Sequence, residues 1–94
     1  MVILRIEHKV QNYDGWKKMF DSDPIGRKKS GVKSYKIFRP VEDQNFVIID
    51  LEFDNLDHAK SVLESLKKVW SNIDGKVVFS PQTKILNVAE STVY

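Results

Sequence analysis

Polar and apolar residues alternate from the start of the chain, where positions 2–10 read VILRIEHKV. Because successive side chains of a β-strand point to opposite faces, this alternation predicts a half-buried strand. One face of this strand carries Val2, Leu4, Ile6, His8 and Val10, and the other carries Ile3, Arg5, Glu7 and Lys9.

A helical spacing follows this strand. Apolar side chains recur every three or four positions, at Tyr13, Trp16, Met19 and Phe20. This spacing predicts an amphipathic helix that begins near residue 14. Because proline is tolerated in the first turn of a helix, Pro24 predicts a second short helix over residues 23–30, which Gly31 closes.

The second half of the chain predicts a hairpin and a long helix. Residues 32–39 and 46–53 have the composition of strands, and the polar loop between them joins two antiparallel neighbours. Asp54 or Asn55 caps the long helix that follows. Its apolar stripe consists of Ala59, Val62, Leu63, Leu66, Val69 and Trp70.

Residues 71–81 predict a loop with at most a short extended piece at 76–79, and residues 83–89 predict the last strand. The order of elements is then β, α, β, β, α, β. This order predicts an α+β, ferredoxin-like fold with a four-stranded antiparallel sheet of spatial order 4-1-3-2 and both helices on one face. The 94 residues suffice for one core, so residues 1–94 form a single domain.

The sheet face without helices predicts a homodimer. Phe46 and Ile48 lie on that face and would form an apolar patch in a monomer, which a second copy would cover. Arg5 on the first strand faces the third strand, so it should form a cross-strand ion pair with Asp50 or Glu52. The expected dimer interface therefore consists of Arg5, Phe46, Ile48, Asp50 and Glu52. The two carboxylates are expected to be neutralised by Arg5 and not to act as an acid/base pair.

Composition excludes several classes of function. The chain has 15 basic and 13 acidic residues, and the net charge of +2 is too weak to indicate nucleic-acid binding. It has no cysteine, which excludes disulfides and thiolate chemistry. No apolar run reaches the roughly 18 residues of a membrane span, and a strand that begins at residue 2 leaves no room for a signal peptide, so a cytoplasmic location is expected.

His8 is the most informative candidate for chemistry. Its titratable ring lies on a strand face that is otherwise apolar, so it points into the interior beneath the helices. Either the ring is a structural group with both nitrogens paired to protein atoms, or it is an acid/base on the wall of a pocket. His58 lies on the polar side of the long helix and is expected to be solvated. Two histidines so far apart do not make a metal site.

The other candidates are aromatic residues and one arginine. Trp16, Phe20 and Trp70 lie on apolar stripes, where they either pack the core or bind substrate. Tyr35 shares a strand face with Arg39, so its hydroxyl and the guanidinium could hold a ligand oxygen, although Arg39 could instead form a structural ion pair. The glycines form neither a phosphate-binding loop nor a nucleophile elbow.

Several segments together resemble the dimeric α/β-barrel superfamily, which includes antibiotic-biosynthesis monooxygenases, small cyclase-like proteins and heme-degrading monooxygenases. They are Glu7–Val10, Tyr13–Lys17, Asp23–Arg27, Gly31-Val32 with Tyr35, Arg39–Asp43 and Asp50–Phe53. The resemblance implies two sheets that face each other across a dimer axis and a ligand cavity between helices and sheet. The Asn-Trp-His set of the staphylococcal-type heme-degrading enzymes is not recognisable, so no heme or other cofactor is expected.

Two functions fit these observations. The first is a small-molecule-binding dimer, with or without catalytic activity. The second is a cofactor-independent monooxygenase or cyclase-like enzyme for a hydrophobic, aromatic or enolisable substrate, in which His8 is the base and Tyr35 and Arg39 hold the enolate oxygen. A cavity large enough for a bicyclic ligand, with His8 on its wall, would favour the enzyme.

Overall fold

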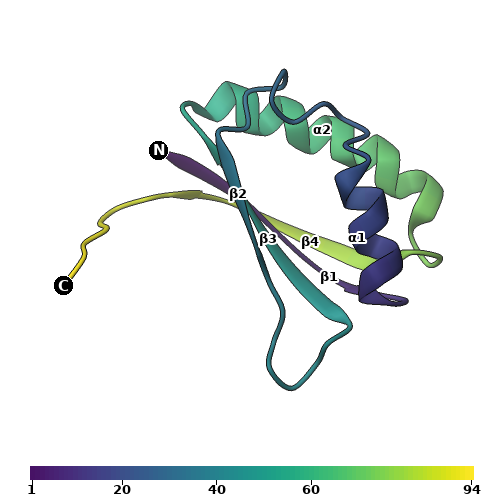
Figure 1. The fold of residues 1–94 in the computed structure, drawn as a ribbon. Coiled ribbons are helices and arrows are strands. Elements are labelled where there is room, and N and C mark those ends of the chain that lie inside the picture. The colour runs from purple at the N-terminus through teal and green to yellow at the C-terminus, as the bar shows by residue number, and fades with distance from the viewer.

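The sheet and two helices form as the order of elements predicts. A computed structural model describes residues 1–94. The elements are β1 (Val2–Val10), α1 (Tyr13–Asp21), β2 (Ser34–Phe38), β3 (Phe46–Phe53), α2 (Leu56–Ile73) and β4 (Val78–Asn87). The strands pair in the antiparallel order β2-β3-β1-β4, and both helices cover the same face of the sheet (Figure 1). The predicted ferredoxin-like α+β fold is therefore confirmed.

The core lies between the helices and the sheet. Alternate residues of the central strands β1 and β3 turn inward and are buried: Val2, Leu4, Ile6, His8, Val10, Val47, Ile49, Leu51 and Phe53. The helices contribute Trp16, Ala59 and Val62 to this layer. Removing this apolar surface from water is the main source of stability of the fold.

Both helices begin at asparagine caps. The side chain of Asn12 accepts a 2.7 Å hydrogen bond from the amide of Gly15, so α1 begins slightly earlier than predicted. Asn55, and not Asp54, caps α2 through a 2.9 Å bond from the amide of His58. Helix α2 continues to Ile73, into a stretch that was predicted to be a loop.

The predicted second short helix over residues 23–30 is wrong. This segment is a series of turns. Asp23 and Gly26 adopt left-handed backbone angles, with φ of 54° and 62°, which interrupt a helix. The Asp23 carboxylate accepts a 2.9 Å bond from the amide of Arg27, so the chain folds back and carries Arg27 beneath the sheet edge.

The last strand is longer than predicted. The structure has a continuous β4 from Val78 to Asn87, where the sequence predicted a loop up to residue 81. Pro81 fits because β4 is an edge strand, in which one side needs no hydrogen-bond donors. The pairing of β1 with β4 shifts register between Glu7 and Lys9, which marks a β-bulge beside the proline.

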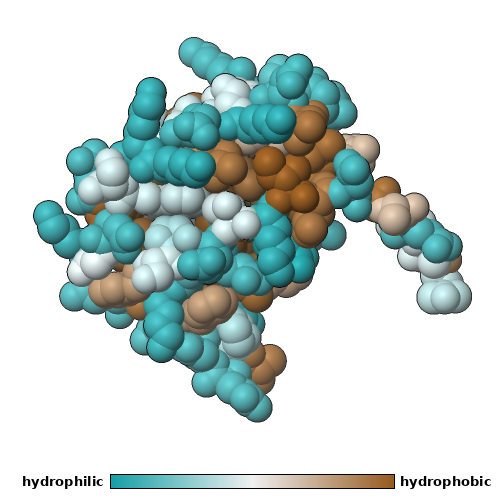
Figure 2. All heavy atoms as spheres, turned by 180° about the vertical axis from the view of Figure 1, so that it is seen from behind, coloured by the Kyte–Doolittle hydropathy of each residue, from teal (hydrophilic) through white to brown (hydrophobic).

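The end of the chain leaves the body of the domain. Residues 88–94 run outward from β4 (Figure 1), and Val88, Val93 and Tyr94 are exposed along this tail. Seen from behind, hydrophobic surface gathers beside the point where the tail departs (Figure 2). None of the helices has the length and apolar character needed to cross a bilayer.

Candidate functional site

A small cavity lies between the two helices and the sheet. Its volume is about 50 Å³. The sheet contributes Ile6, His8 and Ile49, helix α1 and the turns after it contribute Trp16, Met19, Phe20, Pro24 and Arg27, and helix α2 contributes Leu66, Val69 and Trp70. His8 and Arg27 are the two residues of this lining that carry ionisable side chains.

His8 has one hydrogen-bonded and one open ring nitrogen. Nδ1 lies 3.1 Å from the carbonyl oxygen of Lys9. A carbonyl only accepts, so Nδ1 carries the proton and Nε2 of the neutral ring is an acceptor. Nε2 has no protein partner, and no fully buried side-chain nitrogen or oxygen is left unpaired. Nε2 is therefore not fully enclosed by protein atoms, and His8 is one of the residues that line the cavity.

Burial sets the protonation state of His8. The residue is 3% exposed, and desolvation lowers the pKa of its imidazole below the ordinary value. The hydrogen bond to the Lys9 carbonyl and the charge of Asp74 act in the opposite direction, but more weakly. His8 is consequently a neutral base near pH 7, with its lone pair available to a ligand.

The three aromatic residues predicted to bind substrate all line the cavity. Trp16 is 3% exposed and contacts the His8 ring edge-on, with centroids 5.9 Å apart. Phe20 lies against Trp16 at 5.2 Å. Trp70 is half-buried and faces them from α2. The sequence therefore located the wall of the cavity correctly.

The cavity is too small for a bicyclic ligand in this conformation. It has room for a few water molecules and is much smaller than a cavity of about 150 Å³, which can hold benzene. A ring-sized molecule would enter only if a side chain of the wall moved. In this conformation the cavity is therefore smaller than expected for an enzyme that acts on a bicyclic substrate.

Arg27 is the residue of the wall that sequence reasoning missed. Arg27 also lines a surface hollow of about 620 Å³, so it borders both the cavity and this hollow. The guanidinium stacks on the Phe20 ring at 4.0 Å and lies 5.2 Å from the Tyr35 ring. Nη1 donates to the Phe20 carbonyl at 2.7 Å and lies 3.4 Å from Oδ1 of Asp23. The only signal for this ion pair in the sequence is the four-residue spacing of Asp23 and Arg27.

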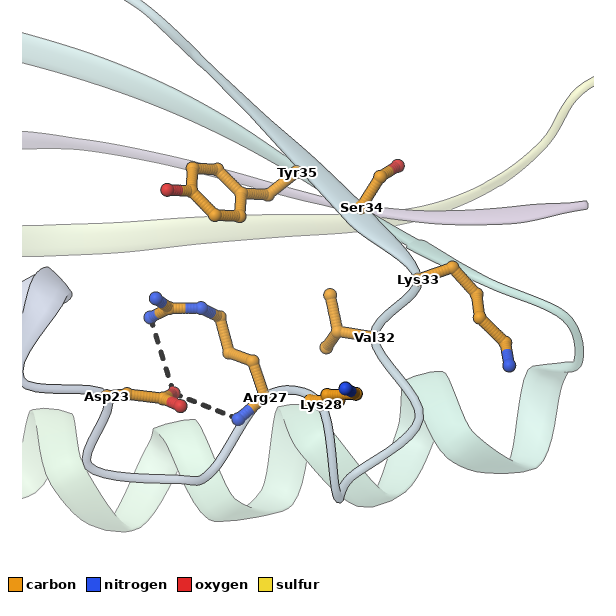
Figure 3. A pocket seen from close by; sticks show the side chains of 7 residues that line it. All are labelled: Asp23, Arg27, Lys28, Val32, Lys33, Ser34 and Tyr35. Carbon is orange, nitrogen blue, oxygen red and sulfur yellow. Dashed lines mark hydrogen bonds and ion pairs between the residues drawn. The ribbon is translucent and has the colours of Figure 1, made fainter.

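Tyr35 and Arg39 do not join His8 in the cavity. Tyr35 is on the wall of the outer hollow (Figure 3). Its ring contacts the Phe20 ring edge-on, with centroids 5.0 Å apart. Arg39 is exposed, stacks over the Tyr13 ring at 3.9 Å and forms no ion pair. The alternative of a structural ion pair for Arg39 is therefore wrong, because a π-face takes the place of the carboxylate.

The predicted ion pair on the helix-free face is confirmed for Asp50. Nε and Nη2 of Arg5 each donate a 2.8 Å bond to this carboxylate, and the two residues are direct partners in the β1–β3 register. Glu52 lies opposite Ile3 in the same register and forms no ion pair with Arg5. Hydrogen bonding and the charge of Asp50 raise the pKa of Arg5 further.

Comparisons with known proteins support the fold. Neither family models nor curated proteins match the sequence. Among solved structures, a Deinococcus radiodurans protein provisionally assigned as an antibiotic biosynthesis monooxygenase is similar, with a TM-score of 0.77 and 12% identity over 100% of this chain and 98% of that chain. A structural-genomics protein from Agrobacterium tumefaciens matches with a TM-score of 0.64 and 15% identity, over 93% and 92% of the two chains. The chain therefore has the same fold as these two solved structures.

Proposed function

We propose that this protein binds a small apolar molecule in the cavity between its helices and its sheet. The observation that carries the proposal is the neutral, buried His8, whose Nε2 has no protein partner in a wall that is otherwise almost entirely apolar. An acceptor that no protein group satisfies, in a largely apolar wall, favours a ligand that brings a hydroxyl or N–H group to it. Ligand entry requires Arg27 or Phe20 to move, because the closed cavity holds only a few waters.

A cofactor-independent monooxygenase or cyclase-like activity is the second candidate. The lone pair on Nε2 of His8 could remove a proton from an enolisable substrate. Arg27 would be the cationic donor for such an enolate, since it lines the same cavity. Tyr35 and Arg39, which the sequence suggested for this role, would have to reach the substrate from outside the cavity. The assignment of the Deinococcus radiodurans structure favours the same class of reaction.

Native mass spectrometry of protein purified from its own host tests the binding proposal. The wild-type protein should retain a small molecule, and its release should change the fluorescence of Trp16 and Trp70. His8→Gln should weaken retention while leaving the fold intact, and His58→Gln is the matched control because His58 is exposed. Equal retention by both variants, or wild-type protein that is always empty and does not take up apolar probes, would refute the proposal.

We also propose that the helix-free sheet face joins two copies of the chain. This face carries Phe38, Phe46, Ile48, Phe79 and Leu86 among charged residues, following the pairing register. Its charges nearly cancel, with Arg5, Lys9, Lys36 and Lys84 against Glu7, Asp50 and Glu52, so two such faces would not strongly repel each other. The exposed Val93 and Tyr94 on the outward tail add apolar surface for a partner to cover.

Sedimentation velocity at micromolar concentration tests the dimer. Wild-type protein should sediment as a dimer, and Ile48→Asp should give a monomer because it buries a charge at the centre of the interface. Leu56→Asp is the control, since Leu56 is an exposed apolar residue at the start of α2, outside the sheet face. A monomeric wild-type protein would refute this assembly.

A further inference from the structure

We propose that the ligand of the cavity carries a carboxylate, and that Arg27 binds this group at the cavity mouth. This inference rests on the proposed ligand-binding function and assigns the chemical class of the ligand. Its starting point is the position of Arg27, whose side chain lines both the inner cavity and the outer hollow.

The guanidinium of Arg27 has free donors. Nη1 is occupied by the Phe20 carbonyl and by Asp23. Nε and Nη2 have no hydrogen-bond partner in the protein, although the side chain is only 16% exposed. These two nitrogens form the edge of an arginine that binds a carboxylate with two parallel hydrogen bonds. Arg5 uses this same edge to hold Asp50 at 2.8 Å on the other face of the sheet.

The hollow outside Arg27 favours an anion. It is lined by the cationic residues Arg27, Lys28 and Lys33 and by a single carboxylate, Asp23. Lys33 is paired with Asp54 at 3.2 Å, whereas Lys28 forms no ion pair. Figure 3 shows the Arg27 guanidinium beneath the ring of Tyr35, with Asp23 on its other side. The excess of positive charge would attract a carboxylate and hold it at the mouth.

The two ends of the ligand then have different sites. Its apolar part would occupy the enlarged cavity beside Trp16 and Trp70, and a polar hydrogen near this part would meet Nε2 of His8. Its carboxylate would take the open edge of Arg27, and this interaction would offset the loss of the stacking contact with Phe20 when the side chain moves. A small aryl or alkyl carboxylate fits this arrangement better than a neutral hydrocarbon.

A matched pair of probes tests the inference in the wild-type protein. Phenylacetate and phenylacetamide have the same ring and nearly the same shape, but only the first is charged. Binding is followed by NMR through the indole N–H signals of Trp16 and Trp70. Phenylacetate should bind about tenfold more tightly or better, as expected for a charge-assisted, two-bond contact. Arg27→Gln should remove most of this preference, and Lys29→Gln, which loses the same charge at an exposed site outside the hollow, should keep it.

The outcomes separate this inference from the proposed function. If both probes shift the indole signals with equal affinity, the cavity binds ligands but the carboxylate assignment is wrong. If Arg27→Gln folds and keeps the preference, Arg27 is not the anion site and the inference is also wrong. If neither probe perturbs the indole signals, both the inference and the binding proposal fail. The wild-type comparison decides the matter even if the Arg27 variant does not fold.

Discussion

Protonation of His8 should weaken the fold. The ring is 3% exposed, and burial lowers its pKa below the ordinary value of 6.5 that it regains on unfolding. Below pH 6.5 the unfolded chain therefore binds a proton at this residue before the folded chain does. The contribution of His8 to stability is present above pH 6.5 and is lost as the pH falls through its folded-state pKa.

The size of the effect follows from proton linkage. Where one more proton is bound in the unfolded state, the free energy of unfolding falls by about 1.4 kcal/mol for each pH unit. Because the unfolded ring is only half protonated at pH 6.5, a decrease from pH 6.5 to 5.5 should cost up to about 1 kcal/mol from His8 alone. This is a substantial share of the roughly 5–15 kcal/mol that stabilises a typical domain.

Urea denaturation at pH 7.5, 6.5 and 5.5 measures this contribution. Wild-type protein and His58→Gln should both lose stability between pH 6.5 and 5.5, and His8→Gln should lose less by up to the amount given above. His58→Gln is the control because it removes an exposed imidazole. Protein concentration is held constant, since dimerisation would add its own contribution. A His8→Gln variant with the same pH dependence as the wild type would show that the ring is not held neutral by burial.

Three further substitutions test the packing. Arg5→Ala should lower the free energy of unfolding in urea by about 1–3 kcal/mol, because Asp50, whose side chain is 14% exposed, loses its two hydrogen bonds. Arg5→Lys should recover part of this loss. An unchanged midpoint in Arg5→Ala would mean that the charges are solvated. Trp16→Ala should cost about 3–5 kcal/mol as a core truncation, and a much smaller loss would contradict its burial. Gly31→Ala should lower the melting temperature, because φ is 97° and a Cβ would lie 2.6 Å from Nδ1 of His58. In the double variant with His58→Ala the steric clash is removed, so the melting temperature should recover only in part. An unchanged melting temperature in Gly31→Ala alone would contradict the strained backbone angle.

The candidate site was predictable in part. His8 and its aromatic neighbours Trp16, Phe20 and Trp70 were identified as interior residues because each continues an apolar face of its own strand or helix, and all four line the cavity. Arg27 was not identified. A charged residue in a turn segment has no periodicity that reports its burial, and its contact with Phe20 and Tyr35 depends on the backbone angles of Asp23 and Gly26.

By itself the sequence determined the central strands and the side chains of each that face the core. A shift by one residue would turn Leu4 and Leu51 to the outside, so the alternation excludes it. A shift by two residues keeps the same faces, so only the structure decided that Arg5 lies opposite Asp50 and not opposite Glu52. Only the tertiary structure decided the path of residues 23–30, the continuation of β4 through Pro81 and the volume of the cavity. A turn is selected by distant packing and by left-handed angles that few residues signal. An edge strand tolerates a proline that a central strand would reject. The volume of a cavity is what remains after side chains from separate elements have packed together, so no single stretch of sequence encodes it.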